Sequence, residues 1–388
     1  MDLPNSLLLY LLLLAALAIG FLLGRKDKTS KPQATVIKDY YQGLNFLLGE
    51  RPELGVDRFI QAMEVNDDSI DVHLALASVL RRRGEVDKAI RLHQNLLASP
   101  LLSSTNKQLV EFELARDYHA AGLLDRAEGL LTDIVSRKDA QLKPAHSLLM
   151  DLYEQERDWQ KALDLSLRLS VTDVVLKARL SHFHCEMGSA LLAKGEIRAA
   201  MEAAKSAISM DASNPRGHWL AAEIDHHKKN YKSTLKRLAK VVELQSDLGA
   251  EVMTLYASAC NALGADNAYS DFLMSSLNRN PDPRLLVAMM DFRKQHGLDP
   301  DLHDIVTYIE IAPSGQHLSL LLELLDAKDT AAQQRIRKLL QKLSSSTTAQ
   351  QCQNCGFYTH HHLWHCPTCK HWGSFSQPTS ANTDSTMV

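Results

Sequence analysis

The hydrophobic and polar positions along this chain follow the period of an α-helix over most of its length. From about Asp39 to Leu343, apolar residues recur every three or four positions, which predicts one amphipathic helix after another. Leu7–Leu23 breaks this pattern, because it is a run of seventeen residues without a charge. A run of that length predicts a membrane-spanning helix.

The charges on either side of this apolar run predict its orientation. Arg25, Lys26, Lys28 and Lys31 follow it, whereas Asp2 is the only charged side chain before it. A cleaved signal peptide would place positive charge before the run, so we favour an uncleaved anchor. Because positive flanks stay in the cytoplasm, we expect the short N-terminus to face outward and the main body to be cytoplasmic. Residues 1–24 form the predicted anchor, and residues 25–38 a basic juxtamembrane tether.

The long helical part of the sequence is a repeat. The text Gly84-Glu-Val-Asp-Lys-Ala-Ile90 recurs at 122–128, 157–163 and 195–201, and in weaker form at 229–235. The small residues inside successive copies are 34 to 38 positions apart, at Gly55, Ala89, Ala127, Ala162, Ala200, Thr234 and Ser270. A period near 34 indicates tetratricopeptide (TPR) repeats, each a helix, a tight turn and a second helix. An irregular helical bundle is the alternative, but it needs no such period.

Stacked repeats of this kind form a superhelical solenoid with a concave groove lined by the first helices. A mixed groove with aromatic residues suits a protein or peptide ligand. For each single residue, an ordinary solvated helix face remains the alternative. The predicted protein-binding residues are Arg81, Arg82, Phe112, Arg116, His119, Trp219 and Glu223.

The sequence therefore divides into an anchor, a tether, a repeat domain and a short C-terminal region. We predict TPR repeats over residues 39–343, with a less regular stretch after Pro281. Residues 344–351 are a polar linker, and 352–375 form a separate cysteine-rich segment. Residues 376–388 are poor in apolar side chains, which predicts a disordered tail.

Composition and charge exclude several classes of function. The 388 residues carry a formal net charge of -3, so nothing indicates nucleic acid as a partner. The sequence has no glycine-rich phosphate loop, no His-Glu-x-x-His and no Gly-x-Ser-x-Gly. His182 and His184 lie beside Cys185, but within a repeat helix, where a structural role is the better interpretation. We therefore predict a non-enzymatic protein.

The candidate chemistry lies in four cysteines near the C-terminus. Cys352, Cys355, Cys366 and Cys369 form two Cys-x-x-Cys pairs separated by ten residues. Gly356 can take the left-handed conformation that closes a metal knuckle, and Pro367 stiffens the second knuckle. Two knuckles place four thiolates on a tetrahedron, which predicts one structural zinc per chain. Iron is the alternative, because the two loops resemble those of rubredoxin, whereas disulfides are disfavoured in the cytoplasm.

The same short segment is rich in histidine and in apolar side chains. His360, His361, His362, His365 and His371 could be extra ligands, but four thiolates already complete a tetrahedral shell. We favour a polar hairpin tip between the knuckles. The apolar residues Phe357, Tyr358, Leu363, Trp364, Trp372 and Phe375 are too many for so small a segment to bury. We therefore expect this segment, a rubredoxin-like four-cysteine metal-binding knot, to dock onto the helical stack or onto a partner.

Taken together, the anchor, the repeats and the four-cysteine metal-binding segment resemble the lipopolysaccharide assembly protein B family (LapB, also called YciM). The resemblance covers essentially the whole chain in the same order. It is most specific at Asp39-Tyr40, 43–48, 83–94, 116–128, 352–357 and 365–369. The family's four metal-binding cysteines match Cys352, Cys355, Cys366 and Cys369. The histidine triplet, the longer polar tail and the stretch after Pro281 depart from the family.

The resemblance implies a function that spacing alone does not give. Members of this family are inner-membrane adaptors of Gram-negative bacteria, so we expect this chain to be a single-pass inner-membrane protein with a periplasmic N-terminus. They work with the membrane protease FtsH to control the level of LpxC, the deacetylase that commits precursor to lipid A. FtsH, LpxC and other lipopolysaccharide assembly proteins are then the expected partners, and homo-oligomerisation stays open. The alternatives are a membrane-tethered rubredoxin-like electron carrier and a TPR scaffold of another envelope complex.

Overall fold

The computed structural model of the chain describes residues 67, 69–137, 143–167, 173–298, 350–359 and 361–377. The predicted anchor and tether, the repeat copy around Gly55 and most of the tail lie outside these residues. Within the described ranges, no helix is both long enough and apolar enough to span a membrane.

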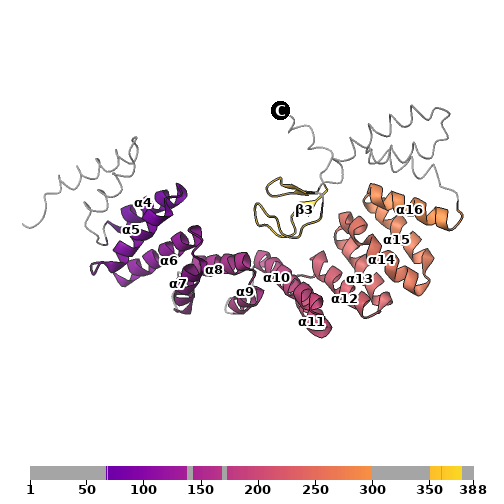
Figure 1. The fold of residues 1–388 in the computed structure, drawn as a ribbon, viewed down its shortest axis with the longest axis horizontal. Coiled ribbons are helices and arrows are strands. Elements are labelled where there is room, and N and C mark those ends of the chain that lie inside the picture. Colours follow the sequence, from indigo (N-terminus) through magenta and orange to yellow (C-terminus); the bar gives the residue numbers. More distant parts are fainter. Residues whose placement is uncertain are drawn as a thin grey trace, which may run out of the picture. The chain divides into compact units, whose positions relative to one another are not determined.

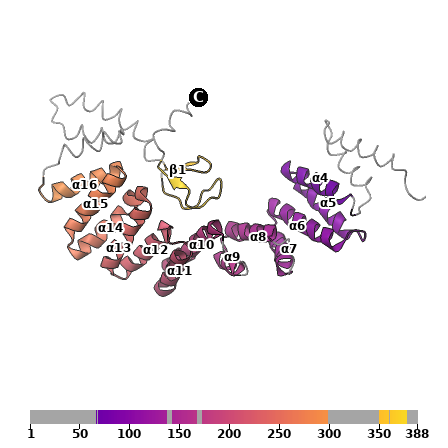
Figure 2. The ribbon, with the colours of Figure 1, turned by 180° about the vertical axis from the view of Figure 1, so that it is seen from behind.

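The chain divides into two compact units, residues 1–156 and 157–388. Within each unit, successive helices pack side by side, as Figures 1 and 2 show. The described helices of the first unit are α4 (Ile70–Arg82), α5 (Val86–Ala98), α6 (Ser104–Ala120), α7 (Leu124–Ser136) and α8 (Lys143–Glu156). Those of the second are α9 (Trp159–Ser166), α10 (Val174–Ala193), α11 (Ile197–Met210), α12 (Pro215–His227), α13 (Tyr231–Leu244), α14 (Gly249–Leu263), α15 (Asp266–Arg279) and α16 (Pro283–Gln295), with a 3₁₀ turn η1 (Ser246–Leu248).

The predicted turns of the repeat are present with one shared backbone geometry. Gly84, Gly122 and Gly195 have φ angles of 82°, 72° and 78°, in the left-handed region that glycine adopts at little cost. Arg157 and Lys229 stand at the same place in the two copies that lack glycine, with φ of 58° and 59°. The copies therefore share a turn conformation even where the glycine is missing, which supports the repeat assignment.

The small residues of the second helices lie where neighbouring helices approach most closely. Ala89, Ala127, Ala162, Ala200 and Thr234 are all 0% exposed. A side chain larger than these would push the paired helices apart. The mostly helical repeat architecture predicted from the sequence is confirmed for the described part of the chain.

The last position of this series was assigned wrongly. Ser270 is only half-buried, unlike the other small residues. Helix α14 ends at Leu263, and the next residue, Gly264, has a φ of 62° that marks the turn. Counting from this turn as in the other repeats places Tyr269, not Ser270, at the equivalent position. The sequence favours Ser270 because the other residues of the series are small, and Ser270 is small whereas Tyr269 is not.

The C-terminal segment folds as a small sheet rather than as a helix. Strands β1 (Gln350–Cys352), β2 (Tyr358–Thr359) and β3 (Phe375–Ser376) form an antiparallel sheet in the order β2-β1-β3. The core of the segment comprises Cys352, Cys366 and Phe375, with Phe357 and Leu363 packed against them. The sheet spans residues 350–376, slightly more than the predicted 352–375. We call this segment, residues 350–377, the knot.

Candidate metal centre

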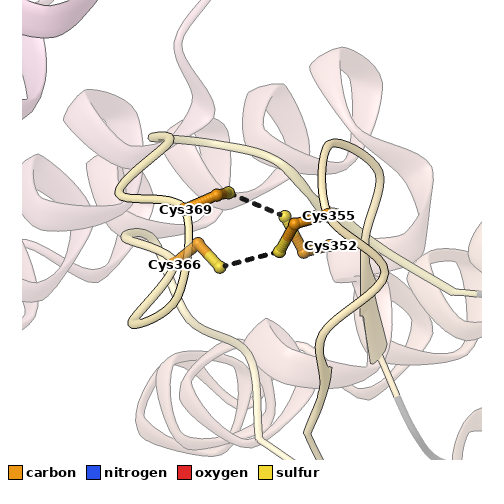
Figure 3. Close-up of side chains that lie close together, drawn as sticks. All are labelled: Cys352, Cys355, Cys366 and Cys369. Carbon is orange, nitrogen blue, oxygen red and sulfur yellow. Dashed lines mark hydrogen bonds between the residues drawn. The ribbon is translucent and has the colours of Figure 1, made fainter. Parts of the chain in front are cut away.

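The first Cys-x-x-Cys pair forms a closed turn at the end of β1. The Gly356 N–H donates to the Cys352 carbonyl at 2.9 Å, and the Cys352 N–H donates to the Phe357 carbonyl at 2.9 Å. Gly356 has a φ of 77°, as predicted for the residue that closes the knuckle. This turn directs the Cys352 and Cys355 side chains to the same side of the backbone (Figure 3).

The second pair repeats this geometry without a glycine. The Lys370 N–H donates to the Cys366 carbonyl at 3.0 Å, and the Cys366 N–H donates to the His371 carbonyl at 2.9 Å. Lys370 takes the place of Gly356, with a φ of 60°. Sequence reasoning pointed to Pro367 and missed Lys370. Lys370 directly follows Cys369, just as Gly356 directly follows Cys355. This shared position is the signal that could have identified Lys370.

The four sulfur atoms face one another between the two knuckles (Figure 3). All four lie within 4.8 Å of one another, and the Cys352–Cys369 and Cys355–Cys366 Sγ–Sγ distances are both 3.6 Å. A tetrahedral metal with bonds of roughly 2.3 Å to sulfur requires Sγ–Sγ distances of about 3.8 Å. The residues present therefore fit a single four-thiolate metal ion, as the sequence predicted.

The electrostatics of the four thiols also favour a bound cation. A hydrogen bond from the Asn354 side chain and backbone donation from His371 lower the pKa of Cys369 to about 5, against the effect of burial. The Phe357 N–H favours the Cys355 thiolate, but partial desolvation and hydrogen bonds to the three other thiols raise the pKa of Cys355 to about 12. Four thiols at these distances cannot all lose their protons at neutral pH without a positive charge among them.

The two sides of the centre differ in exposure. Cys352 and Cys366 are buried in the core of the knot, whereas Cys355 is exposed and Cys369 half-buried. One face of a bound metal would thus look toward solvent through the side chain of Cys355. In the described part of the chain, the only group of three or more potential ligands that converge in this way is these four cysteines.

The histidines of the knot have other partners. His362 Nδ1 lies 2.7 Å from Gln350 Oε1, His365 Nε2 lies 3.1 Å from the Lys370 carbonyl, and His371 Nδ1 lies 3.2 Å from the Cys369 carbonyl. His361 is exposed, and His360 lies outside the described residues. These positions agree with the predicted role of the histidines as hairpin residues rather than ligands.

The knot docks onto the helices of the second unit, as its excess of apolar residues predicted. Trp372 stacks on His182 of α10, with ring centroids 4.9 Å apart, and Trp364 meets Trp219 of α12 edge-on at 5.9 Å. At the edge of the stack, the Gln245 side chain donates to the Phe375 carbonyl, and Gln377 donates to Asp282 at 2.7 Å. Tyr358 is the exception among the apolar residues, because it stays 52% exposed.

The residues around Cys185 have structural surroundings, with Cys185 buried against α11 and α12. His182 is 5% exposed and serves as a stacking surface for Trp372. Cys185 is 0% exposed, and burial raises the pKa of its thiol to about 12. A buried thiol with so high a pKa is inert as a nucleophile.

The predicted protein-binding residues of the first unit have mixed positions. Arg82 and Arg116 are exposed, and Phe112 and His119 are half-buried. Arg81 instead points between helices, where it contacts Glu113 at 2.9 Å and Asp117 at 2.7 Å. Its side chain is only 10% exposed, so little of it is available to a partner. The protein-binding role of this set stays a prediction.

Of the two predicted protein-binding residues of the second unit, Trp219 contacts the knot. Trp219 packs against Trp364, and burial raises the pKa of the neighbouring Glu223, against a hydrogen bond from Trp219. The occupant of this part of the helical face is therefore the chain's own C-terminal segment. The sequence predicts that the knot docks, but not that it docks on Trp219.

The fold and the centre together define a TPR-repeat protein that carries a rubredoxin-like four-cysteine metal-binding knot at its C-terminal end. The comparisons with known proteins agree with this class. Residues 351–377 match a family model described as a rubredoxin metal binding domain, the LapB zinc ribbon, and residues 72–103 match a tetratricopeptide repeat model. The family model that matches the knot is named for both rubredoxin and a zinc ribbon, so it supports a metal site with either zinc or iron.

Whole-chain relatives support the resemblance to one particular family. The chain is 28% identical to lipopolysaccharide assembly protein B of Escherichia coli strain K12, over 95% of this chain and 97% of that protein. It is 27% identical to the protein of the same name from Haemophilus influenzae, with the same coverage. The chain is thus a homologue of these proteins over nearly its whole length, and the resemblance to the lipopolysaccharide assembly protein B family is confirmed. Among solved structures, MamA of Desulfovibrio magneticus RS-1 is similar at 16% identity and a TM-score of 0.30, covering 47% of this chain and 97% of that one.

Proposed function

We propose that this protein is an inner-membrane-anchored TPR adaptor that regulates lipopolysaccharide synthesis by promoting FtsH-dependent degradation of the deacetylase LpxC. The observation that carries the proposal is homology to lipopolysaccharide assembly protein B over 95% of the chain. The helical repeats and the C-terminal four-cysteine knot support it, because both occur in the order that the family resemblance implies. Adaptors bind protein partners, and repeat stacks are built around surfaces that do so.

The architecture suits regulation at a membrane. An anchor at Leu7–Leu23 would confine the body to the cytoplasmic face of the inner membrane and raise its effective concentration beside a membrane protease. The exposed side chains of Arg82 and Arg116 leave a polar surface on the first unit for a protein substrate. The knot covers part of the second unit, so we assign substrate recognition to the first unit. No enzymatic activity is part of this proposal.

The test is a pull-down of the detergent-solubilised protein from native membranes, with mass spectrometry of the partners and of the bound metal. We expect FtsH and LpxC together with one zinc per chain. Recovery of neither protein, with the helical fold intact, would contradict the adaptor proposal. A matched variant that lacks Leu7–Leu23 should still bind LpxC but should regulate its level poorly. Full regulation by that variant would refute the role of the anchor.

Two observations favour a second candidate, a membrane-tethered electron carrier. The knot matches a rubredoxin model, and Cys355 is exposed, as an iron site that exchanges electrons with a partner would require. Colour separates the two candidates. A four-thiolate iron site absorbs visible light and bleaches on reduction, whereas a zinc site is colourless. A colourless protein with one zinc per chain would exclude the electron carrier.

A further inference from the structure

The contact between the knot and the helices gathers all four tryptophans of the chain. Trp159 begins α9 and Trp219 lies in α12, while Trp364 and Trp372 belong to the knot. The ring centroids of Trp159 and Trp372 are 6.1 Å apart, and those of Trp219 and Trp364 are 5.9 Å apart. Aromatic rings at these distances attract one another beyond the burial of their surface. Intrinsic fluorescence of this protein therefore reports on the docked knot.

The second knuckle holds both tryptophans of the knot. Trp364 comes two residues before Cys366, and Trp372 three residues after Cys369. The Gly373 N–H donates to the Trp364 carbonyl at 2.8 Å, and His365 pairs with Trp372 as an isolated β-bridge. Trp364 and Trp372 thus lie on the two arms of one hairpin, and Cys366 and Cys369 lie between them toward its tip. A metal on Cys366 and Cys369 would fix the separation of the rings.

Arg216 of α12 lies at the centre of this contact. Its guanidinium carbon is 5.7 Å from the ring centroid of Trp364 and 5.6 Å from that of Trp372. One side-chain nitrogen donates to Glu186 at 2.8 Å, whereas Nη1 is buried with no hydrogen-bond partner among the described residues. The residue is only 9% exposed. A desolvated guanidinium over two indole rings is a strong form of cation–π contact.

We propose that metal binding and docking are cooperative, and that Arg216 and Trp219 are positioning residues for metal retention although neither is a ligand. The docked state holds Trp364 and Trp372 in the arrangement that also closes the second knuckle around a metal. Docking therefore orders part of the second knuckle before metal binds, and metal binding orders part of the docking surface. Each step lowers the conformational entropy that the other step has to lose. By linkage, the factor by which docking raises the affinity of the knot for metal is the factor by which metal raises the docking equilibrium. A substitution that leaves the knot undocked for more of the time therefore lowers its affinity for metal.

The first test is the rate of metal release from the full-length protein. Zinc-loaded protein is mixed with an excess of a chromogenic chelator, and the rate of zinc transfer is recorded. We expect Trp219→Ala to release zinc about tenfold faster, which corresponds to about 1.4 kcal/mol, and Trp219→Phe to restore most of the retention. Tyr231→Ala is the matched control, because its ring contacts His226 of the same repeat instead of the knot. It should release zinc at the unaltered rate.

The second test separates positioning from general destabilisation. Arg216→Gln keeps a hydrogen-bonding side chain for Glu186 but removes the charge that faces the two rings. It should also release zinc faster, while the helical circular dichroism stays unchanged. Titration of zinc into metal-free protein should shift tryptophan emission to shorter wavelength, at a higher zinc concentration in the variant. Equal release rates in all variants would overturn the proposal. Equal acceleration in Tyr231→Ala would do so too, because it would indicate loss of helical stability alone.

Discussion

Asp117 joins three helices of the first unit in a buried network of charged side chains. Its carboxylate is 0% exposed and accepts hydrogen bonds from Arg81 Nη1 of α4 at 2.7 Å and from His93 Nδ1 of α5 at 2.5 Å. Asp117 itself lies in α6, and His93 is also fully buried. Replacing Asp117 by Ala would leave His93 without its carboxylate partner, and Arg81 with Glu113 alone.

The structure sets the expected magnitude. Removing one partner from a buried ion pair destabilises a protein by about 3–5 kcal/mol, because the other charge stays buried and unpaired. Glu113 remains 2.9 Å from Arg81 and neutralises it in part, so we expect the lower end, about 3 kcal/mol. Such a loss lowers the protection of amide hydrogens against exchange on the order of a hundredfold. Hydrogen exchange is the suitable assay, because two units need not unfold in one step.

The control is Arg116→Ala, which removes a more exposed ion pair with Glu113. The Arg116 side chain is 46% exposed, so its loss should change protection in α4–α6 by less than about threefold. The reasoning would be refuted if Asp117→Ala behaved like Arg116→Ala. It would also be refuted if protection in α12–α15 fell equally, because the effect would then not be local. A confirmed result would assign Arg81 to helix packing rather than to a protein partner.

Three further outcomes follow from the second unit. The double substitution Cys366→Ser and Cys369→Ser should abolish zinc binding, as measured by metal analysis. It should also shift tryptophan emission to longer wavelength. Retained zinc would contradict the four-thiolate site. Burial lowers the pKa of His362 from 6.5 to about 4, with Arg216 and Glu251 as its charged neighbours, so docking should be full above pH 6.5 and weaken as pH falls toward 4. Fluorescence of His362→Gln should lack that part of the pH dependence, and an unchanged pH profile would refute it. Gly188→Val should destabilise α10–α12 by about 1–3 kcal/mol in thermal unfolding, because a Cβ there lies 2.7 Å from Leu220, whereas Gly129→Val meets open space and is the control.

Short-range sequence patterns determined the repeats and the metal centre. A left-handed turn residue followed five positions later by a small buried residue is a local requirement of two closely packed helices, so it recurs at Gly84 and Ala89 and in the later copies. The four cysteines lie within eighteen residues, and their spacing dictates the two knuckles. Even so, Lys370 in its left-handed conformation was not predicted, because its residue type does not favour that conformation.

Only the tertiary structure decided what covers each helical face. Arg81 and Trp219 both occupy positions that ordinarily face a groove, yet one is held by Asp117 of α6 and the other by Trp364 of the knot. Gln245 meets Phe375, 130 positions away in the sequence, through a single hydrogen bond. Periodicity shows that a face exists but carries no information on which distant segment packs against it. That choice depends on shape, charge and burial summed over residues far apart in the chain, which become neighbours only when the protein has folded.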